Sequence, residues 1–384
     1  MNTRTQKTVV YLIRTLNLGG AERYLVETVT HLDRSRFLPK VYCIAGGGSQ
    51  EAVLRKHGIE VTIFQAGTER SALVFLQKFQ SVYAYLQRTR PDIVHAYMFT
   101  PGIYGGLAVK LLGLPKLVTT RMRLGIFKDA RPHYQWVENW VNGFTDAIMA
   151  NSQAVRADVL RRERIAAERV HVIYGGVDLA KYTKAWELRH DKEHRKHLKA
   201  QWGIPAEAPI VGMLGNLYEY KGYRELALAA AELHGRYPET RFVCIGEDRG
   251  FKRELERLAQ EHKLNGRLMF TGMVEDVTAI LPILDIQVLA SHQEGFSSAL
   301  LEGMAVGNPL VATRVGGNPE AVVHEKTGLL IPPKDAHALA RALSTLLQNP
   351  ERAAQFGRNG RQRVEEYFSL HAMVQQLETL YEDL

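Results

Sequence analysis

Two glutamates bracket the run EGFSSALLE, in which Glu294 and Glu302 stand eight residues apart, directly after a strand-like stretch at 285–289. On an α-helix, eight residues rise about 12 Å in a little over two turns, so two such carboxylates lie near one face of the helix. We expect Glu294 to open a helix that begins near Ser297, just after Gly295, and whose free backbone N–H groups face an anion. This spacing suits an elongated phosphate-bearing ligand, with a polyhydroxylated group at Glu294, a diphosphate at the helix start and a second diol at Glu302.

Two neighbouring glycines in the first half could bring the backbone close to a ligand. Gly19 and Gly20 belong to RTLNLGGAER, between a strand-like run and a helix that we expect to begin at Ala21. Glycine has no Cβ, so the main chain can approach a ligand closely before the helix starts. The dinucleotide pattern G-x-G-x-x-G is absent, and the alternative is a turn needed only for packing.

His95 and Lys221 are two titratable side chains near the expected ends of strands. His95 follows PDIV, at the expected carboxyl edge of the first sheet, where open α/β sheets bind ligands. An isolated histidine at such a position is more often structural. Lys221 lies in EYKG before an expected helix, where its ammonium could face a phosphate, and the alternative is a surface lysine.

Strand-like runs alternate with helix-length segments along nearly the whole chain, which predicts an α/β protein with parallel sheets and crossover helices. The first half should contain strands at 8–14, 39–44, 61–64, 92–96, 116–120, 147–150 and 171–174. The second half should contain strands at 210–214, 241–245, 267–271, 285–289, 310–312 and 328–331. We also expect one charged helix over 184–199 that ends at Gly203, and two final helices at 351–367 and 370–384.

The composition indicates a globular protein with two domains. The chain has 384 residues, with 46% hydrophobic and 23% charged residues, and is longer than one hydrophobic core usually serves. Cys43 and Cys244 stand one in each half, inside expected strands, and fit buried thiols in a reducing compartment better than a disulfide. No Cys or His spacing suggests a metal site.

The charge is asymmetric along the sequence. Residues 1–200 contain 31 Lys and Arg against 17 Asp and Glu, a balance of +14, whereas residues 201–384 contain 18 against 24, a balance of −6. The basic half would attract anionic lipid headgroups or an acceptor with a phosphate linkage, and the alternative is an ordinary solvated surface. The positive charge is scattered without a recognition motif, so nucleic-acid binding is not expected.

No targeting or membrane-spanning segment is expected. The first residues lack an uninterrupted apolar run with a small-residue cleavage site, because Arg14 closes a short strand. The most apolar candidate for a membrane span, at 93–109, contains His95, Pro101 and several glycines. We therefore expect a cytoplasmic protein, with peripheral contact to the cytoplasmic face of an inner membrane as a possibility for the basic half.

Taken together, several segments resemble retaining nucleotide-sugar glycosyltransferases with two Rossmann-like domains, the GT-B type, and most of all glycosyltransferase family 4. The most specific segment is SHQEGFSSALLEGMAVGNPLVATRVGGNPEAV, from Ser291 to Val322. LGGAER, PDIVHAY, YGGVD and GNLYEYKG extend the similarity over most of the chain in the expected order. The resemblance implies two domains that face each other across a cleft and a C-terminal helix that crosses back to the N-terminal domain.

For the nucleotide-sugar donor, the resemblance implies that Glu294 holds sugar hydroxyls and that Glu302 holds the ribose diol. It places the diphosphate at the start of the helix and the nucleobase after the strand at 267–271. The expected donor-binding residues are Gly19, Gly20, Asn216, Lys221, Met273, Val274, Glu294, Gly295, Phe296, Ser297, Ser298 and Glu302. For Met273 and Val274 the alternative is a plain βα turn in which Asp276 caps the next helix.

For catalysis, the resemblance implies roles for His95 beside the reacting centre, Lys221 against the leaving diphosphate, and Glu294. Asn216 stands where family members often have an arginine, so this clamp lacks its usual second cation. Arg14, Arg224, or Arg121 and Arg123 could compensate. Arg121 and Arg123 are also candidates for acceptor binding. Arg121 precedes and Arg123 belongs to the basic and aromatic segment 122–136, which could capture an acceptor at a membrane surface or be an ordinary packed loop.

The expected division is an acceptor domain of residues 1–176 with 368–384 and a donor domain of residues 177–367. The expected reaction moves a hexose or N-acetylhexosamine from a nucleotide diphosphate sugar, as co-substrate, to a glycan or lipid-linked acceptor. UDP is the favoured carrier, and no metal or other cofactor is expected, because no D-x-D motif occurs and Lys221 can stabilise the leaving group. A sugar-nucleotide epimerase or phosphorylase of the same architecture and a non-enzymatic polyanion-binding protein are the alternatives.

Overall fold

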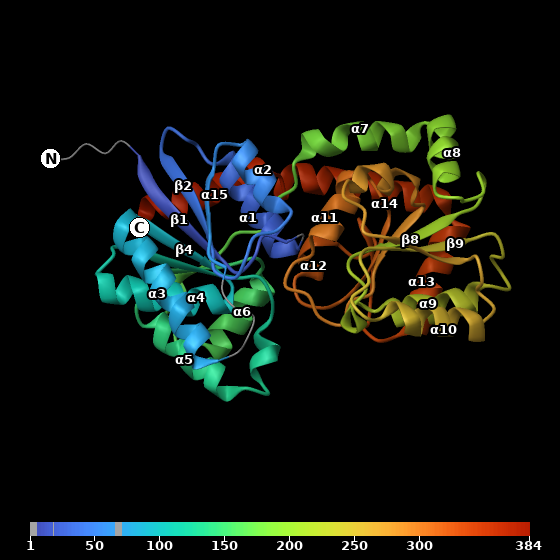
Figure 1. Cartoon of the computed structure of the whole chain (residues 1–384). Coiled ribbons are helices and arrows are strands. Elements are labelled where there is room, and N and C mark those ends of the chain that lie inside the picture. Colours follow the sequence, from blue (N-terminus) through green and yellow to red (C-terminus); the bar gives the residue numbers. More distant parts are fainter. Residues whose placement is uncertain (1–5, 18, 66–70) are drawn as a thin grey trace. The chain divides into compact units, whose positions relative to one another are not determined.

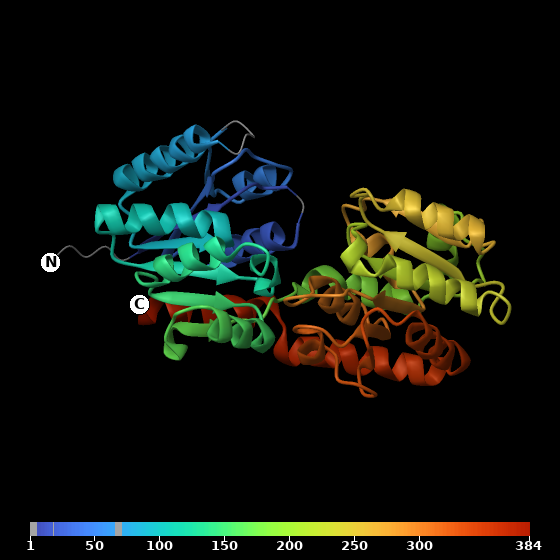
Figure 2. The same cartoon turned by 90° about the horizontal axis from the view of Figure 1, so that it is seen from below.

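Thirteen strands form two parallel sheets within the part of the chain that the structure describes, residues 6–17, 19–65 and 71–384 of a computed structural model. The first sheet has the order β3-β2-β1-β4-β5-β6-β7, and the second has the order β10-β9-β8-β11-β12-β13. The chain divides into one unit of residues 1–175 with 370–384 and another of residues 176–369, each containing one sheet (Figure 1, Figure 2). The prediction of two Rossmann-like α/β domains is therefore confirmed.

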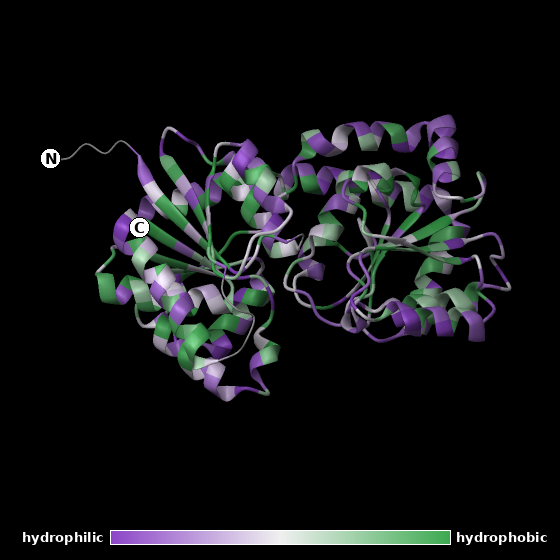
Figure 3. Cartoon of the chain, viewed as in Figure 1, coloured by the Kyte–Doolittle hydropathy of each residue, from purple (hydrophilic) through white to green (hydrophobic). Residues whose placement is uncertain are grey.

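Every strand expected from the sequence is present, with its ends within two residues of the expected positions. The first unit contains β1 (Lys7–Ile13), β2 (Phe37–Cys43), β3 (Glu60–Ile63), β4 (Ile93–Tyr97), β5 (Leu117–Arg121), β6 (Ala147–Ala150) and β7 (Val170–Val172). The second contains β8 (Ile210–Leu214), β9 (Arg241–Ile245), β10 (Leu268–Gly272), β11 (Ile286–Leu289), β12 (Leu310–Thr313) and β13 (Gly328–Ile331). Most strands are hydrophobic along their length (Figure 3), because both faces of a parallel sheet are covered by helices.

Helices cover both faces of the first sheet. Alternate strand residues divide between two cores, one packed against α1, α2 and α15 and the other against α3, α4 and α5. Tyr381 of α15 is fully buried and donates a hydrogen bond to Tyr11 of β1 at 2.9 Å, so the last helix belongs to the first unit, as expected. The helices are α1 (Gly20–His31), α2 (Gln50–Lys56), α3 (Ala72–Thr89), α4 (Phe99–Leu112), α5 (Pro132–Asn142), α6 (Gln153–Arg162) and α15 (Leu370–Asp383), with short 3-10 turns η1 (Gly125–Lys128) and η2 (Ala167–Arg169).

The second sheet carries its largest core against α9, α10 and α13. The helices of this unit are α7 (Leu179–His190), α8 (Lys192–Gln201), α9 (Tyr223–Leu233), α10 (Lys252–Glu261), α11 (Ser298–Ala305), α12 (Asn318–Ala321), α13 (Ala336–Gln348) and α14 (Pro350–Tyr367). Short 3-10 turns are η3 (Glu219–Lys221), η4 (Val277–Ala279) and η5 (Leu281–Ile283). Cys244 of β9 and Cys43 of β2 are buried free thiols, as expected.

The prediction of a single helix over 184–199 is wrong. The chain forms α7 and α8 instead, and they meet at Asp191, whose backbone is extended and whose carboxylate caps α8 by accepting from the backbone N–H of His194 at 3.0 Å. Aspartate competes for backbone N–H groups in this way and so favours helix starts over helix interiors. Asp276 caps the next helical segment, accepting from the backbone N–H of Thr278 at 3.1 Å, but that segment is the short turn η4, followed by η5.

The order of the strands reverses direction between β1 and β4 in the first sheet and between β8 and β11 in the second. Ligands of open α/β sheets bind beyond the carboxyl ends of the strands at such switch points. Lys221 follows β8 and Glu294 follows β11, so the two connections that flank the second switch point carry the residues expected to bind the donor.

Across the described ranges, none of the helices combines the length and the hydrophobicity needed to cross a bilayer.

Candidate functional site

Lys221 and Glu294 form an ion pair between the β8 and β11 connections. The ammonium of Lys221 lies 2.7 Å from Oε1 of Glu294, and the hydroxyl of Ser291 donates to the same oxygen at 2.7 Å. Burial disfavours the charged form of Lys221, but the carboxylate outweighs burial and raises the pKa of this lysine. The site therefore keeps a charged ammonium at the switch point, next to a carboxylate that can accept hydrogen bonds from hydroxyl groups.

Glu294 lies in the loop before α11 and does not open the helix, which corrects the expectation drawn from the eight-residue spacing. The expected start near Ser297 is confirmed, because Ser297 is the N-cap and the helix begins at Ser298, so the first four residues of the interval are not helical. The loop is held against the β12 connection, because Gly317 N donates to Gly295 O at 2.9 Å and a Cβ on Gly316 would lie 1.8 Å from the carbonyl oxygen of Glu294. A glycine is needed at 316 for this close approach, and its φ of +48° is also one that glycine favours.

The start of α11 has the features of an anion site. Ser297 is the N-cap residue, and its side chain makes no capping hydrogen bond to the first turn of α11. Ser298 is the first helical residue, while Phe296 packs against Phe368 with ring centroids 5.4 Å apart. The N-terminal N–H groups of a helix and its dipole attract anions, so this end of α11 is suited to a phosphate.

Glu302 lies in the second half of α11 and is buried with 4% exposure. A buried carboxylate is retained only where hydrogen bonds or charges compensate for lost hydration. Gln287 on β11 holds α11 against the sheet. Its amide donates to Ala299 O at 2.7 Å and occupies the space that a Cβ on Gly303 would need. Glu294 and Glu302 thus belong to one rigidly supported segment.

The other expected donor residues lie at the carboxyl ends of β8 and β10. Met273 is exposed and Val274 is half-buried, directly after β10, where an apolar contact to a planar ring is possible. Asn216 accepts from the backbone N–H of Glu247 at 3.2 Å, which ties the β8 and β9 connections together. Arg224, one candidate to replace the missing cation, is paired with Glu254 at 2.9 Å.

The sequence did not single out Ser291, Tyr220, His292 and Glu225. His292 N donates to Tyr220 O at 2.8 Å, and the His292 ring contacts Glu225 at 2.9 Å, so the β11 loop is joined to η3 and α9. Ser291 is fully buried and contacts Glu294. The only sequence signal for these residues is their position beside EYKG and EGF, since their contacts join segments far apart in the chain.

In the first unit, the glycine loop precedes α1 as expected. Gly19 is the N-cap residue and Gly20 is the first residue of α1, while Leu18 lies outside the described residues. A Cβ on Gly19 would lie 2.4 Å from the carboxylate of Glu22, whose pKa is raised because the group is partly buried. Glycine at 19 therefore makes room for the first acidic side chain of α1.

The position of His95 contradicts a place at the open edge of the sheet. His95 is the central residue of β4 and has no exposed surface. Its Nδ1 lies 2.5 Å from the hydroxyl of Tyr381, and its Nε2 lies 2.6 Å from the hydroxyl of Thr120. Burial lowers the pKa of His95 to about 3, so the ring is neutral and joins β4 and β5 to α15. The expected position of His95 at the end of its strand is therefore wrong, and its place beside a reacting centre stays a prediction.

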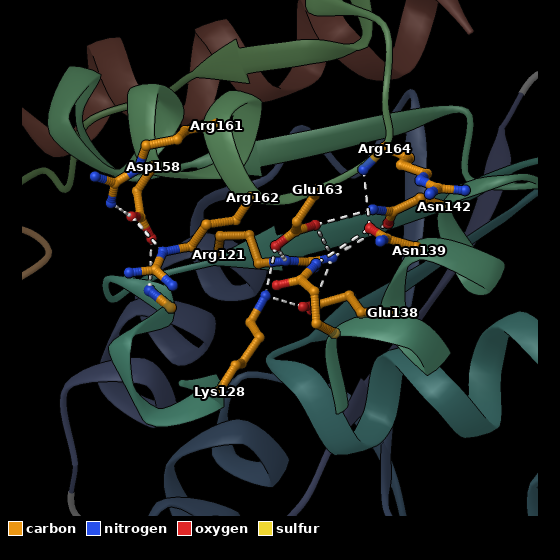
Figure 4. Close-up of polar contacts among 12 residues, drawn as sticks. Arg121, Lys128, Glu138, Asn139, Asn142, Asp158, Arg161, Arg162, Glu163 and Arg164 are labelled. Atoms are coloured by element: carbon orange, nitrogen blue, oxygen red, sulfur yellow. Dashed lines mark hydrogen bonds and ion pairs between the residues drawn. The ribbon is translucent and has the colours of Figure 1, made fainter. Parts of the chain in front are cut away.

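Arg121 is also buried, which argues against its expected contact with an acceptor. Together with Lys128 it lies between Glu138 and Glu163 (Figure 4). The guanidinium donates to both carboxylate oxygens of Glu163 at 3.0 and 3.1 Å and lies 3.0 Å from Glu138. Burial opposes the charge of Glu163, but the two cations lower its pKa to about 2. Arg121 therefore serves an internal ion network.

Arg123 is exposed and differs from Arg121 in this respect. Its guanidinium lies over the ring of Phe127, 4.2 Å from the centroid. Because Arg123 is exposed, the acceptor role expected from the sequence stays a prediction for this residue.

Among the described residues, no group of three or more His, Cys, Asp or Glu side chains is placed to hold a metal ion.

Comparisons with known proteins agree with this arrangement. A family model described as glycosyltransferase family 4 matches residues 18–181, and one described as glycosyl transferases group 1 matches residues 194–363. The D-inositol 3-phosphate glycosyltransferase of Corynebacterium efficiens is 28% identical over 95% of this chain and 90% of its own length. The alpha-maltose-1-phosphate synthase of Mycolicibacterium smegmatis is 31% identical over 74% of this chain and 78% of its own length.

The fold is likewise that of a solved structure. A crystal structure of HepE from Anabaena in complex with UDP and glucose superposes with a TM-score of 0.86 at 23% identity, over 98% of this chain and all of that one. The matches to glycosyltransferase family models and relatives favour a transferase over the epimerase, phosphorylase and polyanion-binding alternatives. The chain belongs to glycosyltransferase family 4 and has the GT-B fold.

Proposed function

We propose that this glycosyltransferase moves a hexose or N-acetylhexosamine from a UDP-sugar to an acceptor hydroxyl with retention of anomeric configuration. The observation that carries the proposal is the Lys221–Glu294 pair beside the start of α11. A donor diphosphate fits between the ammonium and the helix N-terminus, and hydroxyls of the sugar fit the Glu294 carboxylate. The complexes of HepE with UDP and with UDP-glucose support UDP as the carrier.

Lys221 is the group that we expect to act on the leaving diphosphate. As the glycosidic bond breaks, electrons from that bond pass to the diphosphate oxygen, and a fixed ammonium stabilises the added negative charge. Because Lys221 and α11 supply positive charge, we propose that transfer does not depend on a divalent metal ion. Activity that persists in excess EDTA would support this, whereas its loss and restoration by Mg²⁺ or Mn²⁺ would overturn it.

Retention is proposed to follow from same-face attack. The acceptor oxygen attacks the anomeric carbon from the side that the diphosphate leaves, and its proton passes to the leaving phosphate. Glu294 is a weak nucleophile here because its Oε1 already accepts from both Lys221 and Ser291. A covalent sugar adduct on Glu294, detected by mass spectrometry of the trapped enzyme, would overturn this mechanism.

The acceptor is proposed to be a lipid-linked or growing glycan of envelope or exopolysaccharide synthesis. The first unit carries 24 Lys and Arg against 16 Asp and Glu, while the second carries 25 of each, so all of the net positive charge lies in the first. The same unit has an apolar groove of about 350 Å³ between α3, α4 and α5, and its lining includes exposed aromatic side chains of Phe75, Trp136 and Trp140. Exposed aromatic residues on a basic domain suit an anionic lipid surface.

The donor assignment is tested by thermal shift with UDP, GDP, ADP and their sugar conjugates, without added metal. UDP or a UDP-sugar should raise the melting temperature of the wild-type protein and fail to raise that of Glu302→Ala. Glu366→Ala is the matched control, because Glu366 is an exposed glutamate on α14 of the same unit and should leave the shift intact. No shift with any nucleotide in a folded protein would contradict the donor site.

A further inference from the structure

A second concave site in residues 176–369 lies at the opposite edge of the sheet from the candidate donor site. It is a cavity of about 640 Å³, within the usual range for small-molecule sites. Its lining residues Pro209, Asp285 and Pro309 immediately precede β8, β11 and β12, whereas Lys221 and Glu294 follow β8 and β11. Because the strands are parallel, the amino ends and carboxyl ends form two separate edges, so this cavity is distinct from the donor site.

Positive charge converges on this cavity from α7 and α8. Two acidic side chains line it, Glu207 and Asp285. Five basic side chains line it, namely Arg189, Lys192, Arg195, Lys196 and Lys199. Since residues 176–369 are neutral overall, this concentration is local and not a consequence of a basic domain.

Two of these cations, Arg189 and Lys199, are held by neutral oxygens, whereas Lys196 forms ion pairs with Glu193 at 3.0 Å and Glu207 at 4.0 Å. Arg189 donates to Leu284 O at 2.5 Å and to the side-chain oxygen of Asn308 at 2.6 Å, and Lys199 donates to two backbone carbonyls. Arg195 forms an ion pair with Asp285 at 2.7 Å. Its Nε, however, is buried and has no hydrogen-bond partner among the described residues. A buried N–H without a partner in the protein is costly and is usually satisfied by ordered water or by a bound group.

The electrostatics agree with an excess of positive charge. Burial and then the charge of Arg195 lower the pKa of Arg189 to about 10, and burial lowers the pKa of Lys199. The first turn of the 18-residue helix α14 also lines the cavity, through Pro350 and Ala353, and the N-terminal end of a helix dipole is positive. An anion in the cavity would relieve repulsion among these groups.

The opposite wall of the cavity is apolar. Leu346 and Ile286 line this side but are already buried at 1% exposure each, so its accessible apolar surface comes from Leu347 and Ala354. A simple inorganic anion would use only the basic wall and leave these side chains uncovered. A phosphate attached to a small apolar group would use both walls, because hydrophobic burial and charged hydrogen bonds then act on one ligand.

We propose that this cavity binds a phosphate ester, with its phosphate at Arg195, Lys192 and Lys196 and its organic part against Leu347 and Ala354. The phosphate ester could belong to a free metabolite or to a lipid headgroup, since the charge and hydrogen-bonding groups are the same. The site is independent of the proposed transfer reaction and of the donor pocket.

The test is a binding titration of the full chain with hexyl phosphate, inorganic phosphate and vesicles of phosphatidylcholine containing phosphatidylglycerol, each in the presence and absence of UDP. Lys192 and Lys196 are exposed, so Lys192→Glu/Lys196→Glu should fold normally. Lys184→Glu/Arg341→Glu is the matched control, because it makes the same change in charge at exposed positions of the same unit that do not line the cavity. Arg195→Gln, checked for folding by circular dichroism, tests the unpartnered Nε.

We expect hexyl phosphate to bind more tightly than inorganic phosphate, and the Lys192→Glu/Lys196→Glu variant to weaken hexyl phosphate by about tenfold or more, with the control unchanged. Arg195→Gln should also weaken it. Binding to vesicles alone, with the same dependence on Lys192 and Lys196, would support the site and identify a lipid headgroup as its source. Equal binding by all variants, displacement of the probe by UDP, or no binding of any probe would overturn the proposal.

Discussion

The ammonium of Lys221 and the carboxylate of Glu294 meet at 2.7 Å although the two residues are 73 positions apart in the chain. They follow β8 and β11, which are neighbours in the second sheet because the strand order reverses between them. The contact therefore places one positive and one negative group at the switch point before any ligand binds. Such preorganisation is useful for a reaction in which charge develops on a leaving group.

Replacement of Lys221 by methionine should remove the charge while keeping most of the side-chain volume. We expect kcat/KM for transfer to fall by about 100- to 1000-fold, the range found for loss of one group that stabilises developing negative charge. Steady-state kinetics with a UDP-sugar and a lipid-linked acceptor would measure the change. Lys184→Met, at an exposed lysine on α7, is the control, and equal activity of both variants would remove Lys221 from the mechanism.

Gly316→Ala should disturb the loop that carries Glu294. Its Cβ would lie 1.8 Å from the carbonyl oxygen of Glu294, so either the Gly316 turn or the Glu294 loop must move. We expect a loss of about 2 kcal/mol or more in the free energy of unfolding together with reduced activity. Gly266→Ala is the control, because Gly266 also has a positive φ but a Cβ added there would meet nothing within 4 Å. It should cost about 1 kcal/mol with activity unchanged.

Trp136 and Trp140 provide a test of the proposed lipid surface. Trp136 is 70% exposed and Trp140 is 41% exposed, so their replacement by serine should leave the core intact. Since burial of one large apolar side chain contributes about 1.5–3 kcal/mol, the double variant should bind anionic vesicles at least about tenfold more weakly in co-sedimentation. Tyr367→Ser, at an exposed aromatic residue of the other unit, should bind as the wild type does. Unchanged binding of the tryptophan variant would exclude this surface.

The sequence predicted the strands and the donor segment well because their signals are local. Apolar runs of four to seven residues bounded by glycine or charged residues mark the strands of a buried parallel sheet. EYKG and EGFSSALLE could be recognised without knowledge of their contacts. The spacing of Glu294 and Glu302 misled only where it assumed one continuous helix, since the loop conformation depends on Gly316, 22 residues later.

The roles of His95 and Arg121 could not be predicted because they depend on distant partners. The His95 ring is hydrogen-bonded to Tyr381, which lies 286 residues later in the chain. The position of His95 in a strand does not reveal that a C-terminal helix covers it. Arg121 is the last residue of β5, at the carboxyl edge of the sheet. Glu138 of α5 and Glu163 at the end of α6 nevertheless enclose its guanidinium. Sequence reasoning placed Arg121 correctly at the end of its strand and His95 in the correct strand but at its end, and it could not foresee that both side chains are buried.

The neutral state of His95 predicts a pH dependence of stability. Because the folded pKa is about 3 and the ordinary value is 6.5, the unfolded chain binds one more proton between these values, so stability is lost as pH falls below about 6.5. The contribution should approach about 1.4 kcal/mol per pH unit. In urea titrations His95→Gln should be less stable at neutral pH and show a shallower decline on acidification. His31→Gln, at an exposed histidine on α1, should follow the wild type.

The buried network around Arg121 predicts a strong coupling between residues. Arg121→Met leaves Glu138 and Glu163 with Lys128 as their shared cation, and removal of one partner from a buried ion pair typically costs about 3–5 kcal/mol. The double variant Arg121→Met/Glu163→Leu should lose less stability than the sum of its two single variants, because one cation and one anion leave together. Lys40→Ala, which removes the exposed pair with Glu60, should cost no more than about 1 kcal/mol. Urea unfolding measures the three losses of unfolding free energy. If the loss in the double variant equals the sum of the two single losses, the two side chains act independently and the network is contradicted.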